Sequence, residues 1–172
     1  MIDRVVIRGF REDDPIPSIT KLLHEAYGKL AAMGLRYTAT YQDDGVTLRC
    51  LTRGVPFVAE LDGEIVATVT LYPEAPADCE SEWYRREGVH HFGQFAVHPD
   101  LQSNGLGKRL LRLMEGEAAK RGAKELALDT AEPAHHLRDW YERLGFRQVE
   151  TVQWGSTNYL SVILSKALTP CP

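Results

Sequence analysis

The sequence predicts a single α/β domain over residues 1–172, with a central sheet that is at least partly parallel. Strand-like and helix-like segments alternate through the second half of the chain, an order typical of parallel strand pairing. The first half adds a strand-like segment, an amphipathic helix and a hairpin pattern. With 172 residues, the chain has the length of one domain with a sizeable core, and no repeat, low-complexity segment or linker divides it.

The first expected elements are a strand over residues 5–8 and a helix over residues 15–33. Asp14 is the expected N-cap of this helix, with Pro15 at the first helical position. Gly34 is typical of the residue that follows a helix C-terminus. The helix is predicted from apolar residues at helical spacing, which are Ile19, Leu22, Leu23, Ala26, Tyr27 and Leu30.

A short helix over residues 46–53 and a β-hairpin over residues 56–72 follow. The two β-rich runs of the hairpin flank Asp62-Gly63, a pair that tolerates the positive φ angles of a tight turn. Residues 73–89 then form a long connection that contains two prolines, five acidic residues and two aromatic residues. A connection of this length is usually either functional or mobile.

Residues 90–97 are expected to form a strand, and the segment after Gly105 an amphipathic helix. Gly122 ends this helix, and residues 125–129 are typical of a short buried strand. The apolar stripe of the helix consists of Leu106, Leu110, Leu113, Met114 and Ala118.

The last expected elements are a helix and a pair of strands. The helix begins at Pro133 and ends before Gly145. Residues 146–154 and 158–164 are expected to form the strand pair. One face of the helix carries Leu137, Trp140, Tyr141 and Leu144.

Composition excludes several classes of protein. A net charge of −4 argues against a general nucleic-acid-binding surface, and no apolar run approaches the roughly 20 residues that span a bilayer. The segment from Met1 to Phe10 carries the charged residues Asp3, Arg4 and Arg8 and is typical of a strand rather than of a signal peptide. The three cysteines are scattered and lack the spacing of metal ligands. We therefore expect no metal site and no disulfide framework, which suits a reducing cytoplasm.

The stretch HPDLQSNGLGKRLL, residues 98–111, has the chemistry of an anion-binding turn. Gly105 and Gly107 lie between a predicted strand and a predicted helix, where the missing Cβ lets backbone N–H groups face a ligand. The helix start adds unpaired N–H donors and a partial positive charge, which favour a phosphate or pyrophosphate. Lys108 and Arg109 add positive charge. A glycine-rich turn that caps the helix and binds nothing is an equally compatible interpretation.

Two common phosphate-binding motifs are absent from this stretch. A P-loop requires glycine where Gln102 stands, and a serine or threonine where Arg109 stands. The dinucleotide-binding fingerprint requires glycine where Leu110 stands. These absences disfavour a phosphate-binding protein of another class.

The motif Gln102-x-x-Gly105-x-Gly107, after FAVHPDL and before the amphipathic helix, resembles the acetyl-CoA motif of the GNAT N-acetyltransferase superfamily. The later segment WYERLGF resembles the next motif of that superfamily, a helix ending in Tyr-Glu-x-x-Gly-Phe. Together the two motifs cover roughly residues 92–147, and the preceding order of strand, helix, short helix and hairpin also fits. The resemblance implies the GNAT fold, a mixed central sheet of about seven strands with helices on both faces.

The resemblance further implies that acetyl-CoA is the cosubstrate. The backbone of Phe95, Ala96 and Val97 would then pair with the pantetheine arm. One of these N–H groups would also stabilise the oxyanion of the tetrahedral intermediate. The pyrophosphate would lie on the turn residues Gln102, Ser103, Asn104, Gly105, Leu106, Gly107 and Lys108.

Tyr141 matches the family's tyrosine that faces the CoA sulfur. The leaving thiolate has to be protonated, and tyrosine is a neutral donor with a pKa of about 10. A tyrosine packed in the core beside Leu137 and Leu144 is the structural alternative. The chain departs from the family on the central strand, because Gly93 and Gln94 stand where many members carry a carboxylate that helps to deprotonate the amine.

The missing carboxylate leaves the proton acceptor open. An alkylamine with a pKa of about 10.4 is neutral in only about one molecule in 2,500 at pH 7. His91 projects from the same strand face as Gly93, so it is a candidate for accepting the proton through a water, with titration expected near pH ~6.5. An ordinary edge or surface histidine is an equally compatible interpretation.

Aromatic residues are expected to border the acceptor groove: Tyr37, Tyr41, Tyr72 and Trp83. The acidic residues of the connection over residues 73–89 favour a cationic amine. A solvated acidic loop with no ligand explains the same residues.

The resulting hypothesis is an N-acetyltransferase that moves the acetyl group of acetyl-CoA to a primary amine by direct attack in a ternary complex. The acceptor is a small-molecule amine or a protein or peptide amine, with no nucleic-acid or membrane partner, and a homodimer is compatible with this fold. The alternative is a non-catalytic acyl-CoA-binding or regulatory module on the same fold. The missing strand carboxylate favours that alternative, and the retained Tyr141 opposes it.

Overall fold

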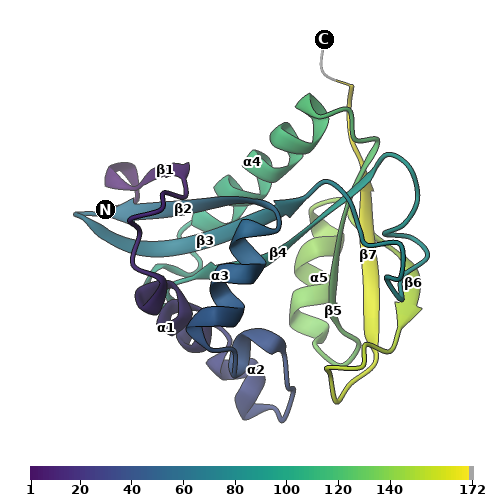
Figure 1. The fold of residues 1–172 in the computed structure, drawn as a ribbon, viewed down its shortest axis with the longest axis horizontal. Helices are drawn as coiled ribbons and strands as arrows, with labels where there is room; N and C mark the ends of the chain where they lie inside the picture. The colour runs from purple at the N-terminus through teal and green to yellow at the C-terminus, as the bar shows by residue number, and fades with distance from the viewer. Residues whose placement is uncertain (171–172) are drawn as a thin grey trace.

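The computed structural model describes residues 1–170 and contains one seven-stranded mixed sheet (Figure 1). The strand order is β1-β2-β3-β4-β5-β7-β6. β4 and β5 pair in parallel, and the other neighbouring strands pair antiparallel. This sheet confirms the predicted α/β fold class with partly parallel pairing.

The strands lie close to their predicted positions, except for the last one. The turn of the β2–β3 hairpin is at Asp62 and Gly63, whose φ angles are 52° and 88°, as their turn chemistry predicts. The final strand begins at Ser161 rather than at residue 158. The strands are β1 (Val6–Gly9), β2 (Val55–Leu61), β3 (Glu64–Tyr72), β4 (Val89–Val97), β5 (Glu125–Ala131), β6 (Arg147–Val152) and β7 (Ser161–Ala167).

The late start of β7 has a tertiary cause. The side-chain amide of Asn158 donates a hydrogen bond to the carbonyl of Gly34 at 2.8 Å and accepts one from the N–H of Arg36 at 2.8 Å. Asn158 therefore joins the segment before β7 to a distant loop and does not extend the strand.

The first helix is shorter than its apolar pattern predicts. One continuous helix over residues 15–33 is wrong, because α1 ends before Tyr27, whose φ and ψ are −92° and 3°. The Tyr27 hydroxyl donates a hydrogen bond to the carbonyl of Phe95 on β4 at 3.1 Å, a contact that helical spacing does not encode. The α-helices are α1 (Ile16–Ala26), α2 (Gly28–Ala32), α3 (Asp44–Thr52), α4 (Leu106–Lys120) and α5 (His135–Arg143).

The predicted cap of α1 is also wrong. Pro15 occupies the N-cap position, and no side chain caps the helix. The Asp14 carboxylate instead accepts two hydrogen bonds from the Arg8 guanidinium, at 2.7 and 2.9 Å, and one from the N–H of Arg11 at 2.7 Å. The bonds from Arg8 lower the pKa of Asp14, and this bidentate, charge-assisted pair replaces the cap.

The helices cover both faces of the sheet (Figure 1). On one face, α1 and α3 pack with the strands around Ile19 and Leu51. On the other face, α4 and α5 pack around Met114. Val58 and Ala59 are neighbours on β2 and belong to opposite cores, as strand alternation requires. Over residues 1–170, no helix is both long and apolar enough to cross a membrane.

β4 and β5 separate near the middle of the sheet. They pair only where Val89–His91 of β4 lies beside Glu125–Ala127 of β5. A register shift against β3 and the positive φ of Gln94, 50°, mark a bulge in β4, and a bulge bends a strand and re-aims its side chains. The two strands therefore diverge beyond His91, and the cavities of the molecule lie along the divergence.

The long connection between β3 and β4 is held against β6. The Glu150 carboxylate accepts hydrogen bonds from the Ser81 hydroxyl at 2.5 Å and from the N–H groups of Glu82 and Trp83 at 2.9 and 3.2 Å. Bonds to an ionised acceptor are stronger than neutral ones. Glu150 therefore anchors a loop that would otherwise cost conformational entropy to order.

Candidate active site

Two adjoining cavities lie where β4 and β5 diverge. We call the first the cradle cavity, of about 600 Å³, because the glycine turn before α4 forms part of its wall. We call the second the aromatic cavity, of about 500 Å³. Both are lined by Tyr27, Tyr37 and Asp129, so these three residues form the junction between them. Consecutive parts of β4 line the two cavities: residues 92–94 face the aromatic cavity and residues 95–97 face the cradle cavity.

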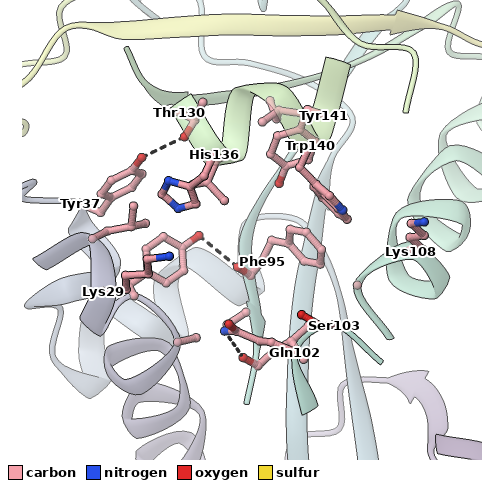
Figure 2. Close-up of a pocket in the computed structure, with 18 of the residues that line it drawn as sticks. Lys29, Tyr37, Phe95, Gln102, Ser103, Lys108, Thr130, His136, Trp140 and Tyr141 are labelled. Atoms are coloured by element: carbon pink, nitrogen blue, oxygen red, sulfur yellow. Dashed lines mark hydrogen bonds between the residues drawn. The ribbon is translucent and has the colours of Figure 1, made fainter. Parts of the chain in front are cut away.

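The glycine turn supplies one wall of the cradle cavity (Figure 2). Gly105 is the N-cap of α4, with φ at 85° and no side-chain cap, so the first N–H groups of the helix have no side-chain partner at the cap. The Gln102 side chain donates a hydrogen bond to the carbonyl of Val97 at 3.1 Å and ties the turn to β4. The turn residues in the wall are Gln102, Ser103, Gly105, Gly107 and Lys108.

Asn104, Leu106 and Arg109 differ from the other residues of the turn in their relation to the cavity wall. Asn104 is not part of that wall. The side chain of Leu106 is buried in the core, so its backbone N–H is the group it would offer to a phosphate. The Arg109 guanidinium donates hydrogen bonds to the carbonyls of Ile2 and Val5, at 3.1 and 3.3 Å. Arg109 therefore anchors the N-terminal segment and adds no charge to the cavity wall.

Other basic side chains in the cradle cavity come from distant segments. Lys29 of α2 and His136 and Arg143 of α5 line the same cavity as Lys108. The sequence analysis missed these three, because only the packing of α2 and α5 brings them to the glycine turn. Figure 2 shows Lys29 and His136 across the cavity from Lys108.

The backbone of β4 is open toward the cradle cavity. Ala96 and Val97 pair with β3 on one side, opposite Thr68 and Ala67, and have no β5 partner on the other. The side chain of Phe95 lines the cavity and stacks on Trp140, with 6.4 Å between ring centroids. This unpaired edge can accept an extended ligand as an additional strand would pair.

Tyr141 lies in the wall of the cradle cavity (Figure 2). Its ring packs edge-on against Trp140 and Phe146, at 4.8 and 5.7 Å between centroids. Burial raises the pKa of Tyr141 well above its ordinary value, so the hydroxyl keeps its proton at physiological pH. Over residues 1–170, that hydroxyl has no hydrogen-bond partner within the protein.

Asp129 is the charged side chain at the junction, and the sequence analysis missed it. Its two carboxylate oxygens accept hydrogen bonds from the Tyr84 hydroxyl at 2.8 Å and the Trp154 indole N–H at 3.1 Å. Burial raises the pKa of Asp129 above its ordinary value, although both bonds oppose that shift. The only signal in the sequence was an acid at the end of an otherwise apolar strand.

The environment of Asp129 suits a cation. None of the ion pairs formed within residues 1–170 includes this carboxylate. Aromatic rings attract cations through their negative faces. The aromatic residues lining the same cavity include Tyr27, Tyr37, Tyr72, Tyr84, Trp154 and Tyr159.

His91 lies in the wall of the aromatic cavity but differs from expectation in its titration. Its ring stacks between Tyr72 and Tyr84, with centroids at 5.1 and 4.1 Å. Burial, together with the nearby charge of Arg53, lowers the pKa of His91 to about 3. The expected titration near pH ~6.5 is therefore wrong, and a ring this weakly basic is a poor proton acceptor at neutral pH.

Two of the four expected acceptor-binding residues line the aromatic cavity and two do not. Tyr37 and Tyr72 are in its wall. Tyr41 lies outside it, beneath the Arg36 guanidinium at 4.2 Å. Trp83 also lies outside it, because its indole donates a hydrogen bond to Ser165 at 3.0 Å and packs into the core under the long connection.

Only some of the acidic residues of the long connection lie at the aromatic cavity. Asp78 and Glu80 line the aromatic cavity, whereas the other three acids of the loop do not. On the opposite wall, the Gln94 side chain pairs with that of Gln42, whose amide donates to it at 2.9 Å. A neutral amide pair therefore occupies the position where many family members carry a carboxylate.

The comparisons with known proteins agree with this geometry. A family model described as Acetyltransferase (GNAT) family matches residues 16–146. An S-(2-succino)cysteine N-acetyltransferase of Bacillus subtilis is 28% identical over 155 residues, which cover 87% of this chain and 88% of that protein.

Solved structures share the fold at low sequence identity. The ribosomal-protein-S18-alanine N-acetyltransferase of Escherichia coli has a TM-score of 0.71 at 18% identity, with 98% of this chain and 96% of that chain covered. A GNAT family acetyltransferase of Elizabethkingia anophelis with acetyl-CoA bound has a TM-score of 0.66 at 21% identity, with 96% and 99% covered. The match to the family model extends from α1 through the glycine turn to the end of the Tyr141 motif. The chain therefore belongs to the GNAT acetyltransferase family.

Proposed function

We propose that this protein transfers the acetyl group of acetyl-CoA to the primary amine of a small acceptor, by direct attack in a ternary complex. The observation that carries the proposal is the junction of the two cavities at Tyr27, Tyr37 and Asp129. A thioester that enters from the cradle cavity and an amine that enters from the aromatic cavity would meet beside one carboxylate.

The cradle cavity fits the phosphate-bearing part of acetyl-CoA. The uncapped start of α4 at Gly105 offers backbone N–H donors, and a helix N-terminus favours an anion. Lys108, Lys29 and Arg143 line the cavity and supply positive charge. These groups would hold the phosphates, and the unpaired edge of β4 would bind the amides of the pantetheine arm.

The aromatic cavity fits the acceptor amine in its cationic form. The Asp129 carboxylate has no ion-pair partner within the described chain and lies among aromatic rings. The side chain is accessible, and desolvation by the surrounding groups raises its pKa, which makes it a stronger base than a carboxylate of ordinary pKa. Asp129 would therefore attract the ammonium group, hold it at the junction and accept its proton.

The proposed reaction uses Asp129 and Tyr141 as proton acceptor and donor. Asp129 takes a proton from the ammonium group, and the freed nitrogen lone pair forms a bond to the thioester carbonyl carbon. A backbone N–H of β4 stabilises the oxyanion that develops. The carbon–sulfur bond then breaks, and the Tyr141 hydroxyl protonates the thiolate. The nitrogen of the new amide gives up its remaining extra proton, which returns through solvent to the Tyr141 oxygen, and Asp129 releases its own proton to solvent. The products are the N-acetylated amine and the free CoA thiol.

The non-catalytic alternative loses its main support in this geometry. It was favoured because Gly93 and Gln94 supply no carboxylate from β4. Asp129 supplies one from the neighbouring strand, at the same junction. The Asp129 carboxylate at the junction, together with the protonated Tyr141 hydroxyl, favours catalysis over simple binding of an acyl-CoA.

The test is a turnover screen with acetyl-CoA, in which release of the CoA thiol is followed and mass spectrometry identifies the product. The panel contains amino acids, their primary amides, S-(2-succino)cysteine, diamines and a peptide with a free N-terminal alanine. We expect N-acetylation of at least one small amine. Binding of acetyl-CoA without turnover of any amine above the buffer rate would instead support the non-catalytic module, and turnover of the peptide alone would overturn the small acceptor.

A further inference from the structure

We infer that Arg53 forms an anion subsite in the part of the aromatic cavity that the cradle cavity does not share, so that the acceptor is an amino acid or a related zwitterion with its carboxylate at Arg53 and its amine at Asp129. This inference rests on the proposed function, because it assigns the substrate class of the same site.

Arg53 is held in the wall of the aromatic cavity by the chain on either side of it. It follows α3 directly, as the C-cap residue. The next residue is Gly54, where an added Cβ would lie 2.4 Å from the carbonyl oxygen of Leu71 and 2.8 Å from the ring of Tyr72. Only glycine permits this close approach of the chain to the end of β3. The approach fixes the position of the Arg53 backbone beside Tyr72.

The guanidinium of Arg53 is oriented by an aromatic ring. It lies over the ring of Tyr72, with 5.0 Å from its central carbon to the ring centroid. The Tyr72 hydroxyl donates a hydrogen bond to the carbonyl of Cys50 at 2.8 Å, which holds the ring in place. A guanidinium that lies over a ring still presents N–H donors along its edge, and that edge matches a carboxylate.

The charge of Arg53 has no partner in the fold. Arg8 and Arg147 each bind acidic side chains, at 2.7 and 2.8 Å, whereas no ion pair within residues 1–170 includes Arg53. Arg53 also lies close enough to the buried ring of His91 for its positive charge to lower the pKa of His91. Asp78 and Glu80 line the same cavity and form no ion pair with Arg53.

The aromatic cavity therefore offers one contact for an amine and one for a carboxylate. Asp129 lies at the junction, which the cradle cavity shares. Arg53 lines the aromatic cavity only, together with Cys50 and Tyr72, and its side chain is exposed to solvent. A ligand with an amine for Asp129 and a carboxylate for Arg53 pairs both charges, whereas a simple alkylamine leaves the Arg53 guanidinium to water.

The test compares each amino acid of the panel with its primary amide, which keeps the amine but removes the negative charge. We expect wild type to prefer the carboxylate form in kcat/KM. Arg53→Gln is expected to lower kcat/KM for the carboxylate form by about ten- to a hundredfold, the range for a hydrogen bond to a charged group, and to leave the amide form nearly unchanged. Arg49→Gln, on the same helix and outside the cavity wall, is the matched control.

Equal use of the two forms by wild type, or an equal loss for both in Arg53→Gln, would overturn the inference. Saturation-transfer NMR of the same ligands separates this result from failure of the proposed function. If no panel member is acetylated, the proposed function fails, but the subsite still predicts that carboxylate members bind wild type and lose binding in Arg53→Gln. Binding that ignores the substitution removes the subsite whatever the activity.

Discussion

Replacing Asp129 by asparagine tests the proposed proton acceptor while preserving its shape. The carboxylate accepts one hydrogen bond on each oxygen, from the hydroxyl of Tyr84 and the indole N–H of Trp154. In Asp129→Asn, the amide oxygen can still accept from Trp154, and the amide nitrogen can donate to the Tyr84 hydroxyl, because a hydroxyl both donates and accepts. Both bonds survive, so we expect the free energy of unfolding to change by less than about 1 kcal/mol.

The expected effect on activity is much larger. The amide neither accepts a proton nor carries the charge that attracts an ammonium group. General acid–base groups contribute about 10²–10⁴-fold to rate, so kcat/KM should fall by that factor. The assay is CoA thiol release at saturating acetyl-CoA, with the best amine of the panel, over a full range of pH.

Tyr84→Phe supplies the matched control. The bond from Tyr84 lowers the pKa of Asp129, so its loss raises that pKa further. The carboxylate is then protonated at a higher pH, and the acidic limb of the kcat/KM profile should move to higher pH with the alkaline limb unchanged. An Asp129→Asn enzyme within threefold of wild type, or a Tyr84→Phe profile shifted to lower pH, would refute the assignment.

The remaining predictions address the cradle, the donor and the histidine. Gly105→Asp should weaken acetyl-CoA binding in calorimetry, because it places a negative charge in the turn and a side chain at φ 85°. The control variant Gly116→Asp, in open space on the same helix, should bind acetyl-CoA as wild type does. Equal affinities in the two variants would contradict the proposed phosphate site at the turn. Tyr141→Phe should lower kcat by about 10²–10⁴-fold. Its acetyl-CoA affinity and melting temperature should stay unchanged, because the hydroxyl has no hydrogen-bond partner in the described chain. An unchanged kcat would show that Tyr141 serves only in packing. His91→Phe should leave the pH dependence of kcat/KM unchanged between pH ~6 and 8, because the pKa of His91 is about 3, and loss of an inflection near pH ~6.5 would restore His91 as the base. Because the pKa of His91 is depressed in the folded state, His91 of the unfolded state binds a proton first as pH falls below about 6.5. Wild type should therefore lose more thermal stability than His91→Phe between pH ~6.5 and ~4. Equal losses in the two proteins would contradict the low pKa of His91.

Some features of this protein follow from short stretches of sequence. The hairpin turn at Asp62 and Gly63 and the glycine turn at Gly105 depend on φ angles that few residues adopt, so the residue types alone predict them. The apolar stripe of α4 predicts its buried face because helical geometry repeats locally. The fold class, the glycine turn and the helix that carries Tyr141 were predictable for this reason.

Other features depend on contacts between distant segments. The helix break at Tyr27 depends on a hydrogen bond to β4, and the loss of the Asp14 cap depends on an ion pair with β1. Trp83 carries the same aromatic chemistry as Tyr84, yet only Tyr84 reaches the cavity. The connection that carries Trp83 and Tyr84 is anchored by Glu150 of β6. Residue propensity and spacing cannot predict which of the two aromatic side chains this distant contact turns toward the cavity.

The sequence by itself determined most of the elements, the fold class and the glycine turn before α4, whereas the tertiary structure decided which side chains line the aromatic cavity. Asp129 is an ordinary acid in the sequence. It becomes a base candidate because β4 and β5 diverge after three paired positions and because Tyr84 and Trp154, 45 and 25 residues away, donate to it. His91 is an ordinary histidine in the sequence, and packing between two tyrosines beside Arg53 removes its basicity. Burial and nearby charge determine the protonation of a side chain, and both are properties of the folded chain rather than of its local sequence.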